Sequence, residues 1–201
     1  MKKSEISLLC GFVLTVIISL ASHQVYDAQQ VCGSTLRLHI IANSNTVQDQ
    51  QIKLEVRDKI LKSEKMFRGG VSDFAEAKQL ATENAAIVEK EINTYLEKMH
   101  APYTAHCSVE KFYFDTTQYD GFVLPKGEYN AFTVRLGKAE GKNWWCVLYP
   151  ALCSTVCGEI QQEKGEGFIK TSRITARFKV VEIYEDIKTK LCGAQSPQYN
   201  N

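Results

Sequence analysis

Residues 36–62 read LRLHIIANSNTVQDQQIKLEVRDKILK, and this junction between an apolar run and a charged run decides the predicted fold. Apolar and polar residues alternate from Leu36 to Ile40, which is typical of a strand. Thr46 and Asp49 form an approximate capping box, so a helix is expected to begin after Thr46. It should span residues 47–62, where apolar side chains recur at every fourth position, at Ile52, Val56 and Ile60.

A second, longer helix is predicted after Arg68-Gly69-Gly70, whose glycines should interrupt regular secondary structure. Ser72 is the expected N-cap, and Pro102 marks the end of the helix. A helix of about 27 residues would be about 40 Å long. Its apolar positions recur at spacings of three and four, at Phe74, Ala77, Ala81, Ala85, Val88, Ile92, Tyr95 and Met99.

Strands are expected after Pro102, where aromatic and β-branched residues become frequent. The alternating segment 129–136 and the apolar segment 144–149 should pair as a hairpin across the loop between them. Apolar residues between Ile174 and Leu191 predict a closing amphipathic helix. This order predicts an α+β fold, with a mixed or antiparallel sheet packed against a long helix and two shorter helices.

The first 21 residues have the pattern of a secretory signal peptide: a short basic start, an apolar run and small residues before a cleavage point at Ala21. An uncleaved N-terminal anchor is the alternative. Residues 22–35 are expected to form a flexible lead, residues 36–192 a single domain and residues 193–201 a tail.

The exported part of the chain is about neutral. Without Lys2, Lys3 and Glu5, the 24 basic and 23 acidic residues become 22 of each. Binding to duplex nucleic acid requires a basic face, so no nucleic-acid partner is expected.

Seven cysteines occur, and six remain once Cys10 leaves with the signal segment. An even number of cysteines in an exported chain permits disulfides, with Cys146–Cys153 the favoured pair. The alternative for Cys146 is a small apolar side chain packed inside a strand. A zinc site at Cys146, Cys153 and Cys157 is disfavoured, because the spacing does not fit and no histidine follows. We expect no metal and no small-molecule cofactor.

Catalytic patterns are not evident. A thiol enzyme would need a histidine placed beside a cysteine, and nothing in the sequence brings the two together. His39 is interpreted as a partly exposed strand residue. Trp144 and Trp145 are more informative, because neighbouring strand residues point to opposite faces. One ring can then serve the core while the other meets a covering element or a partner protein. The alternative is that both rings are buried, because large aromatic rings mostly are.

The sequence resembles the stage II sporulation protein R family in two long motifs. The first motif covers the strand, turn and helix quoted above, with its turn at Ala42-Asn43-Ser44-Asn45, its helix start at Asp49-Gln50 and its charged run from Lys53 through Val56-Arg57-Asp58. The second motif is GEYNAFTVRLGKAEGKNWWCVLYPALC, from Gly127 to Cys153. Phe178-Lys179 with Glu182-Ile183 fits the family's closing helix, so the resemblance extends from residue 36 to about 187.

The resemblance implies an exported, non-enzymatic developmental signal of endospore-forming bacteria. Such proteins are made in the forespore and secreted into the space between the two sporulation membranes. There they trigger a membrane-embedded aspartic protease of the mother cell, which processes the precursor of sigma factor E. The expected partner is therefore the extracytoplasmic face of that protease.

Six residues of the two motifs are the candidates for contact with this partner: Asn43, Ser44, Arg57, Asp58, Trp144 and Trp145. Two other functions remain open from the sequence. One is an envelope thiol enzyme that uses Cys146 or Cys153 as its nucleophile, and the other is a structural protein of the envelope.

Overall fold

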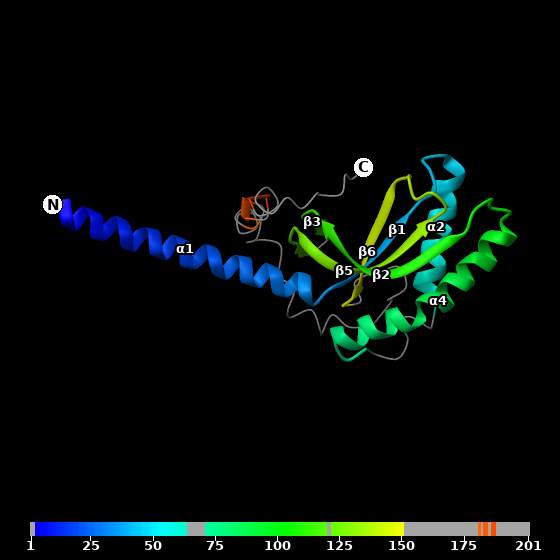
Figure 1. The fold of residues 1–201 in the computed structure, drawn as a ribbon, viewed down its shortest axis with the longest axis horizontal. Coiled ribbons are helices and arrows are strands. Elements are labelled where there is room, and N and C mark those ends of the chain that lie inside the picture. The colour runs from blue at the N-terminus through cyan, green and yellow to red at the C-terminus, as the bar shows by residue number, and fades with distance from the viewer. Residues whose placement is uncertain are drawn as a thin grey trace. The chain divides into compact units, whose positions relative to one another are not determined.

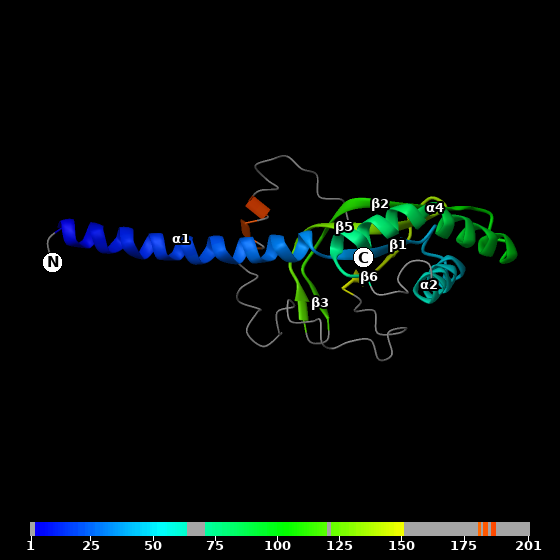
Figure 2. The same ribbon diagram turned by 90° about the horizontal axis from the view of Figure 1, so that it is seen from below.

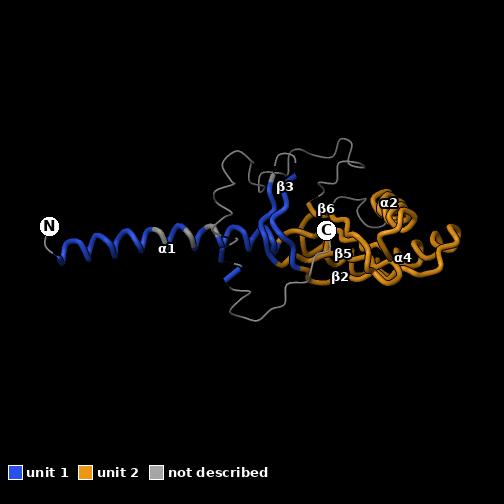
Figure 3. Tube along the Cα trace, turned by 90° about the horizontal axis from the view of Figure 1, so that it is seen from above, with its two compact units in different colours: residues 1–33, 113–127, 167–196 blue, residues 34–112, 128–166, 197–201 orange. Residues whose placement is uncertain are grey.

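The computed structural model describes residues 3–63, 71–119 and 122–150, together with residues 181, 183, 184, 186 and 187 of a last helix. The chain divides into two compact units (Figure 3). Unit 1 comprises residues 1–33, 113–127 and 167–196, and unit 2 comprises residues 34–112, 128–166 and 197–201. The α+β class expected from the sequence is confirmed.

Unit 2 is built on a four-stranded mixed sheet with the order β2-β5-β1-β6 (Figure 1). The strands are β1 (Leu36–Ile41), β2 (Ala105–Phe114), β5 (Gly127–Leu136) and β6 (Asn143–Tyr149). β1 runs parallel to β5 and antiparallel to β6. The predicted hairpin between residues 129–136 and 144–149 is therefore wrong, because β1 lies between the two strands. All six residues of β1 are buried, as a central strand requires.

Two helices of unit 2 are close to their predicted positions. α2 (Val47–Lys62) begins at the expected N-cap, where the Thr46 hydroxyl accepts a hydrogen bond from the Asp49 amide. α4 (Phe74–Lys98) begins one residue later than predicted, with Asp73 as its N-cap in place of Ser72. Ser72 does not cap the helix, because its hydroxyl and its backbone amide both donate hydrogen bonds to the Glu76 carboxylate.

α2 and α4 pack against one face of this sheet (Figures 1 and 2). Leu38 and Ile40 of β1 and Phe132 and Val134 of β5 project into the core that they share. The helices contribute the apolar positions that the sequence periodicity identified, among them Ile52, Val56, Ile60, Val88 and Ile92. Burial of these side chains is the main force that holds the helices on the sheet.

The opposite face of the sheet buries polar side chains. Arg37, His39 and Thr133 are completely inaccessible to solvent, so the interpretation of His39 as partly exposed is wrong. The His39 Nε2 atom lies 2.9 Å from the Asn143 Oδ1 atom, and its ring meets the Phe112 ring edge-on at 4.4 Å. Burial lowers the pKa of His39 to about 4, although the Asn143 hydrogen bond opposes the shift.

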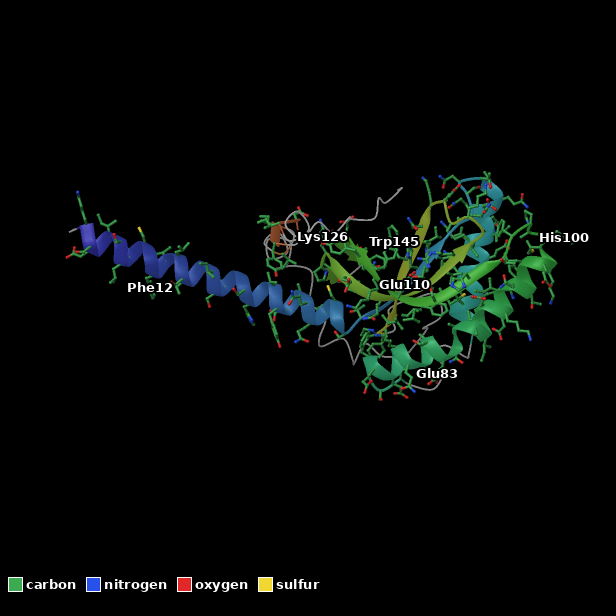
Figure 4. All side chains as sticks on the ribbon, in the orientation of Figure 1. Phe12, Glu83, His100, Glu110, Lys126 and Trp145 are labelled. Carbon is green, nitrogen blue, oxygen red and sulfur yellow. The ribbon has the colours of Figure 1, made fainter. Side chains whose placement is uncertain are left out.

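Unit 1 contains α1 (Lys3–Gly33) and a two-stranded antiparallel sheet of β3 (Thr117–Tyr119) and β4 (Phe122–Leu124). Ala28, Val123 and Val181 form an apolar cluster within this unit. α1 is long and apolar enough to cross a membrane, and its apolar side chains, such as Phe12, are exposed (Figure 4). It therefore fits either a signal peptide or an anchor.

Two sequence expectations about the ends of the chain meet the structure only in part. The segment 22–35, which was expected to be flexible, is helical as far as Gly33. Most of the closing helix expected between residues 174 and 191 lies outside the described residues, and the five residues that are described are helical.

Replacing Ile92 with alanine should lower the free energy of unfolding by about 2–5 kcal/mol, because it removes a buried side chain and leaves a cavity. Ile92 is 2% exposed, whereas Ile87 on the same helix is 45% exposed. Ile87→Ala is therefore the matched control and should change stability by no more than about 0.5 kcal/mol. Urea denaturation measures the free energy of unfolding of both variants. An equal decrease in the two would contradict the packing of α4 on the sheet.

The buried His39 should make the protein less stable in mild acid. Because its folded-state pKa is about 4, the unfolded chain binds one more proton than the folded chain between pH about 6.5 and 4. The free energy of unfolding should fall by up to about 3 kcal/mol as the pH decreases through this window. Denaturation of His39→Gln over the same pH range should lack this component, and parallel pH curves for the two proteins would refute it.

Candidate functional site

The turn between β1 and α2 is organised around the Asp49 carboxylate. Oδ2 of Asp49 accepts hydrogen bonds from Asn43 Nδ2 at 2.8 Å and from the Ser44 hydroxyl at 2.5 Å. Its Oδ1 atom accepts a third from the Tyr103 hydroxyl at 2.7 Å. Burial alone would raise the pKa of Asp49, but the bonds from Ser44, Tyr103 and Asn43 outweigh it and hold the pKa below its ordinary value.

The same turn holds the loop between β5 and β6. Asn43 Oδ1 accepts from the Lys138 amide at 2.9 Å, and Asn45 Oδ1 accepts from the Lys142 amide at 2.7 Å. Gly137 has a φ of +55°, and a Cβ atom there would collide with the Asn43 side chain. The loop therefore depends on Gly137 both for its backbone conformation and for its close approach to the turn.

Asn43 and Ser44 thus use their side chains within the fold. Both atoms of the Asn43 amide are bound, one to Asp49 and the other to the Lys138 backbone. The Ser44 backbone carbonyl in turn accepts from the Gln50 side chain at 2.9 Å. These contacts give the turn a structural task that the sequence indicated only for Thr46 and Asp49.

Trp144 meets Arg57 and Asp58 on the helix-covered side of the sheet, although it lies far from them in sequence. The Arg57 Cζ atom lies over the Trp144 ring, 5.3 Å from its centroid. Its Nε and Nη2 atoms lie 2.8 and 2.7 Å from Asp58 Oδ1. Trp144 is half-buried and packs against the core, so the ring on which the Arg57 guanidinium stacks is fixed in position.

Trp145 lies on the other face of the sheet, as the alternation along β6 predicts. Its ring centroid is 6.1 Å from that of His39, and the side chain is half-buried. Figure 4 labels Trp145 on β6 and Glu110 on β2, which contributes an ion pair with Arg135 to the same face. The two tryptophans therefore serve different surfaces and do not form one site.

Two lysines lie near Arg57: Lys53, which begins the charged run of the first motif, and Lys142, which did not stand out in the sequence. Lys53 is buried on α2, and its ammonium donates to the Lys142 backbone carbonyl at 3.1 Å. Lys142 itself is exposed. The spacing of Lys53 and Arg57 by four residues places them on one side of α2, which is a sequence signal, but only the fold brings Lys142 to them.

The cysteines give no support to a thiol nucleophile in the described part of the chain. Burial, with the nearby Glu89 carboxylate, raises the pKa of Cys107 to about 12. Cys146 is disulfide-bonded, and Cys153, the partner expected from the sequence, lies outside the described residues, so this pairing stays a prediction. Cys157 is outside them too. No cluster of three or more His, Cys, Asp or Glu side chains that could hold a metal ion occurs among the described residues.

A groove of about 850 Å³ lies between α2 and α4 and contains none of the predicted site residues. Its lining includes Lys59, Ile60, Ile87, Lys90 and Ile92. Nothing in the sequence indicates this groove, because its lining combines residues of two helices that are separate in sequence.

Replacing Asn43 with alanine should destabilise unit 2 by about 1–3 kcal/mol, because it leaves two hydrogen-bonding groups without their partner. Asn45→Ala is the matched control: it removes one exposed hydrogen bond, to the Lys142 amide, and should cost about 1 kcal/mol or less. Thermal melts compare the two variants. An unchanged melting temperature for Asn43→Ala would show that the turn does not depend on this side chain.

Comparison with known proteins identifies one family. The family model for stage II sporulation protein R matches residues 33–158, which include the turn, both helices of unit 2 and β6. The stage II sporulation protein R of Bacillus subtilis (strain 168) is 31% identical over 160 residues, covering 76% of this chain and 71% of the relative. No solved structure matches the chain. The chain belongs to the stage II sporulation protein R family.

Proposed function

We propose that the protein is an exported signal of sporulation that activates a membrane-embedded aspartic protease from its extracytoplasmic side. The protease then processes the precursor of mother-cell sigma factor E. The observation that carries the proposal is membership of the stage II sporulation protein R family, established over most of the folded chain. α1 supports export, because it fits a signal peptide or an anchor.

In this proposal the protein is made in the forespore and crosses its membrane into the space between the two sporulation membranes. It acts there as a ligand and not as an enzyme. The buried Cys107 thiol and the disulfide-bonded Cys146 favour a binding role over thiol chemistry.

The surface that contacts the protease is centred on Arg57, Asp58 and Trp144. Arginine and tryptophan dominate the energetics of many protein interfaces. The Arg57 guanidinium already lies over the Trp144 ring and pairs with Asp58, so little side-chain freedom is lost when a partner binds. Asn43 and Ser44 contribute by shaping the neighbouring turn, and Trp145 would serve a contact on the opposite face.

Activation requires the protein to bind one state of the protease more tightly than the other. A ligand shifts a conformational equilibrium only by its differential affinity for the two states. Binding to the extracytoplasmic face would favour the arrangement in which the protease is active, with no chemical step by the ligand itself.

The proposal is tested by co-expressing the protease and the sigma factor E precursor in a non-sporulating host, with and without this protein. Precursor cleavage, followed by immunoblot, should depend on the exported protein. Cleavage that is the same in its absence would refute the proposed function.

Arg57→Ala should reduce processing at limiting protein by about tenfold or more, since loss of a hot-spot residue costs about 2 kcal/mol or more. Lys59→Ala is the matched control. Lys59 lies on α2 as well and makes an equivalent cation–aromatic contact, with its Nζ atom 4.5 Å from the centroid of the Tyr95 ring. This substitution should leave processing near the unmodified level. Equal effects of the two substitutions, or none from Arg57→Ala with the melting temperature retained, would exclude this surface.

A further inference from the structure

Lys53 is a buried cation that lacks a charged partner in the described part of the chain. The side chain is 5% exposed. Its Nζ atom donates to Gln50 Oε1 at 2.7 Å and to the Lys142 backbone carbonyl at 3.1 Å. Both acceptors are neutral, whereas lysines buried to this extent are ordinarily paired with a carboxylate. An ammonium group has three donors, so one N–H remains after these two bonds.

The charges around Lys53 are mainly of its own sign. Burial lowers the pKa of Lys53, and the cations of Lys142 and Arg57 lower it further. The exposed Lys142 ammonium has no ion pair among the described residues, and Arg57 alone has a counter-charge, in Asp58. Among the described residues, these three cations therefore have one carboxylate within ion-pair distance, that of Asp58.

The ammonium group of Lys53 is held in place by the turn described above. Gln50 donates through Nε2 to the Ser44 carbonyl at 2.9 Å, which leaves its Oε1 atom directed at Lys53. The second acceptor comes from the loop that Asn45 fixes at the Lys142 amide. Lys53 is thus positioned from two sides before any ligand arrives, and a positioned charge loses little freedom on binding.

Trp144 supplies an apolar surface beside these charges. Its half-buried ring lies under the Arg57 guanidinium at 5.3 Å. A carboxylate that reaches the cations would therefore have its aliphatic carbons next to an aromatic ring. This combination suits an acidic side chain of a protein better than a small inorganic anion, which cannot use the ring.

We propose that Lys53, Arg57, Lys142 and Trp144 form a recognition site for an acidic side chain in a segment of the protein partner. This inference rests on the proposed function, because it names the chemistry of the partner at the same surface. The incoming carboxylate accepts a hydrogen bond from the remaining N–H of Lys53 and offsets the repulsion between Lys53 and Lys142. The methylene groups of the same side chain pack on Trp144.

The test is a titration of the full chain, held in detergent micelles, with a short glutamate-containing peptide and its glutamine-containing twin. The sequence has two tryptophans, so a nitrogen-15 NMR spectrum resolves two indole signals, which Trp144→Phe assigns. The Trp144 indole signal should shift with the glutamate peptide and respond much more weakly to its twin. Equal responses to the two peptides, or a stronger response to inorganic phosphate, would overturn the proposal.

Lys53→Met and Lys142→Gln should each weaken binding of the glutamate peptide by about tenfold, the effect of losing one charge-assisted contact. Lys53→Met should keep or raise the melting temperature, because it removes a buried charge of similar volume. Lys142→Gln changes an exposed side chain and tests the site even if the Lys53 variant folds poorly. Lys78→Gln, on the exposed face of α4, is the charge-matched control and should bind normally; wild-type binding by both Lys53→Met and Lys142→Gln would refute the site.

This titration and the processing assay can fail independently. A carboxylate-specific shift without protein-dependent precursor cleavage would leave the site intact and refute the proposed function. Conversely, the Trp144 indole signal could lack a glutamate-specific shift while precursor cleavage still depends on the protein and survives Lys142→Gln and Lys53→Met. That result would refute the site and leave the proposed function intact.

Discussion

The Asp49 carboxylate is the interaction on which most of the local structure of unit 2 depends. It accepts hydrogen bonds from Asn43 and Ser44 in the turn after β1 and from the Tyr103 hydroxyl, so it joins the first turn of α2 to two other parts of the chain. A buried carboxylate is costly unless its oxygens are satisfied, and here donors on both oxygens satisfy it. This turn also holds the loop that precedes β6, through Asn43 and Asn45. The positions of Lys142 and Trp144 therefore depend indirectly on Asp49.

β1 separates two layers of different chemistry. Leu38 and Ile40 face the apolar core under α2 and α4, whereas Arg37 and His39 face the other side and are buried there as well. An apolar core tolerates changes of similar volume, but buried polar groups tolerate substitution only if their hydrogen bonds are kept. The side of the sheet with His39 is consequently the more demanding one to alter.

The sequence was sufficient for the elements whose signals are local. Thr46, Asp49 and the four-residue spacing of α2 depend on hydrogen bonds and contacts within a few residues, so the helix and its cap could be predicted. The error at Ser72 was a single residue, because Ser72 and Asp73 are both good caps and only the Glu76 contacts distinguish them.

Strand order was not available from the same signals. β5 and β6 are neighbours in sequence with a loop suited to a hairpin, yet β1 is inserted between them. The alternation in β1 likewise predicted one exposed face, and nothing local indicates that Arg37 and His39 become buried. At the candidate site, the motif residues Arg57 and Trp144 could be named in advance, but their stacking and the burial of Lys53 follow from long-range packing.

The continuity of α1 has a consequence for how far the protein could travel. Its helix runs from the apolar segment to Gly33, and Ala28 packs with Val123 and Val181 inside unit 1. If the segment stayed in the bilayer, no flexible tether would separate it from unit 1, and the search for the proposed partner would be confined to two dimensions at a high effective concentration. If the segment were removed after Ala21, the remaining turns of the helix would become a packed amino terminus, and the protein would spread by diffusion through the whole compartment.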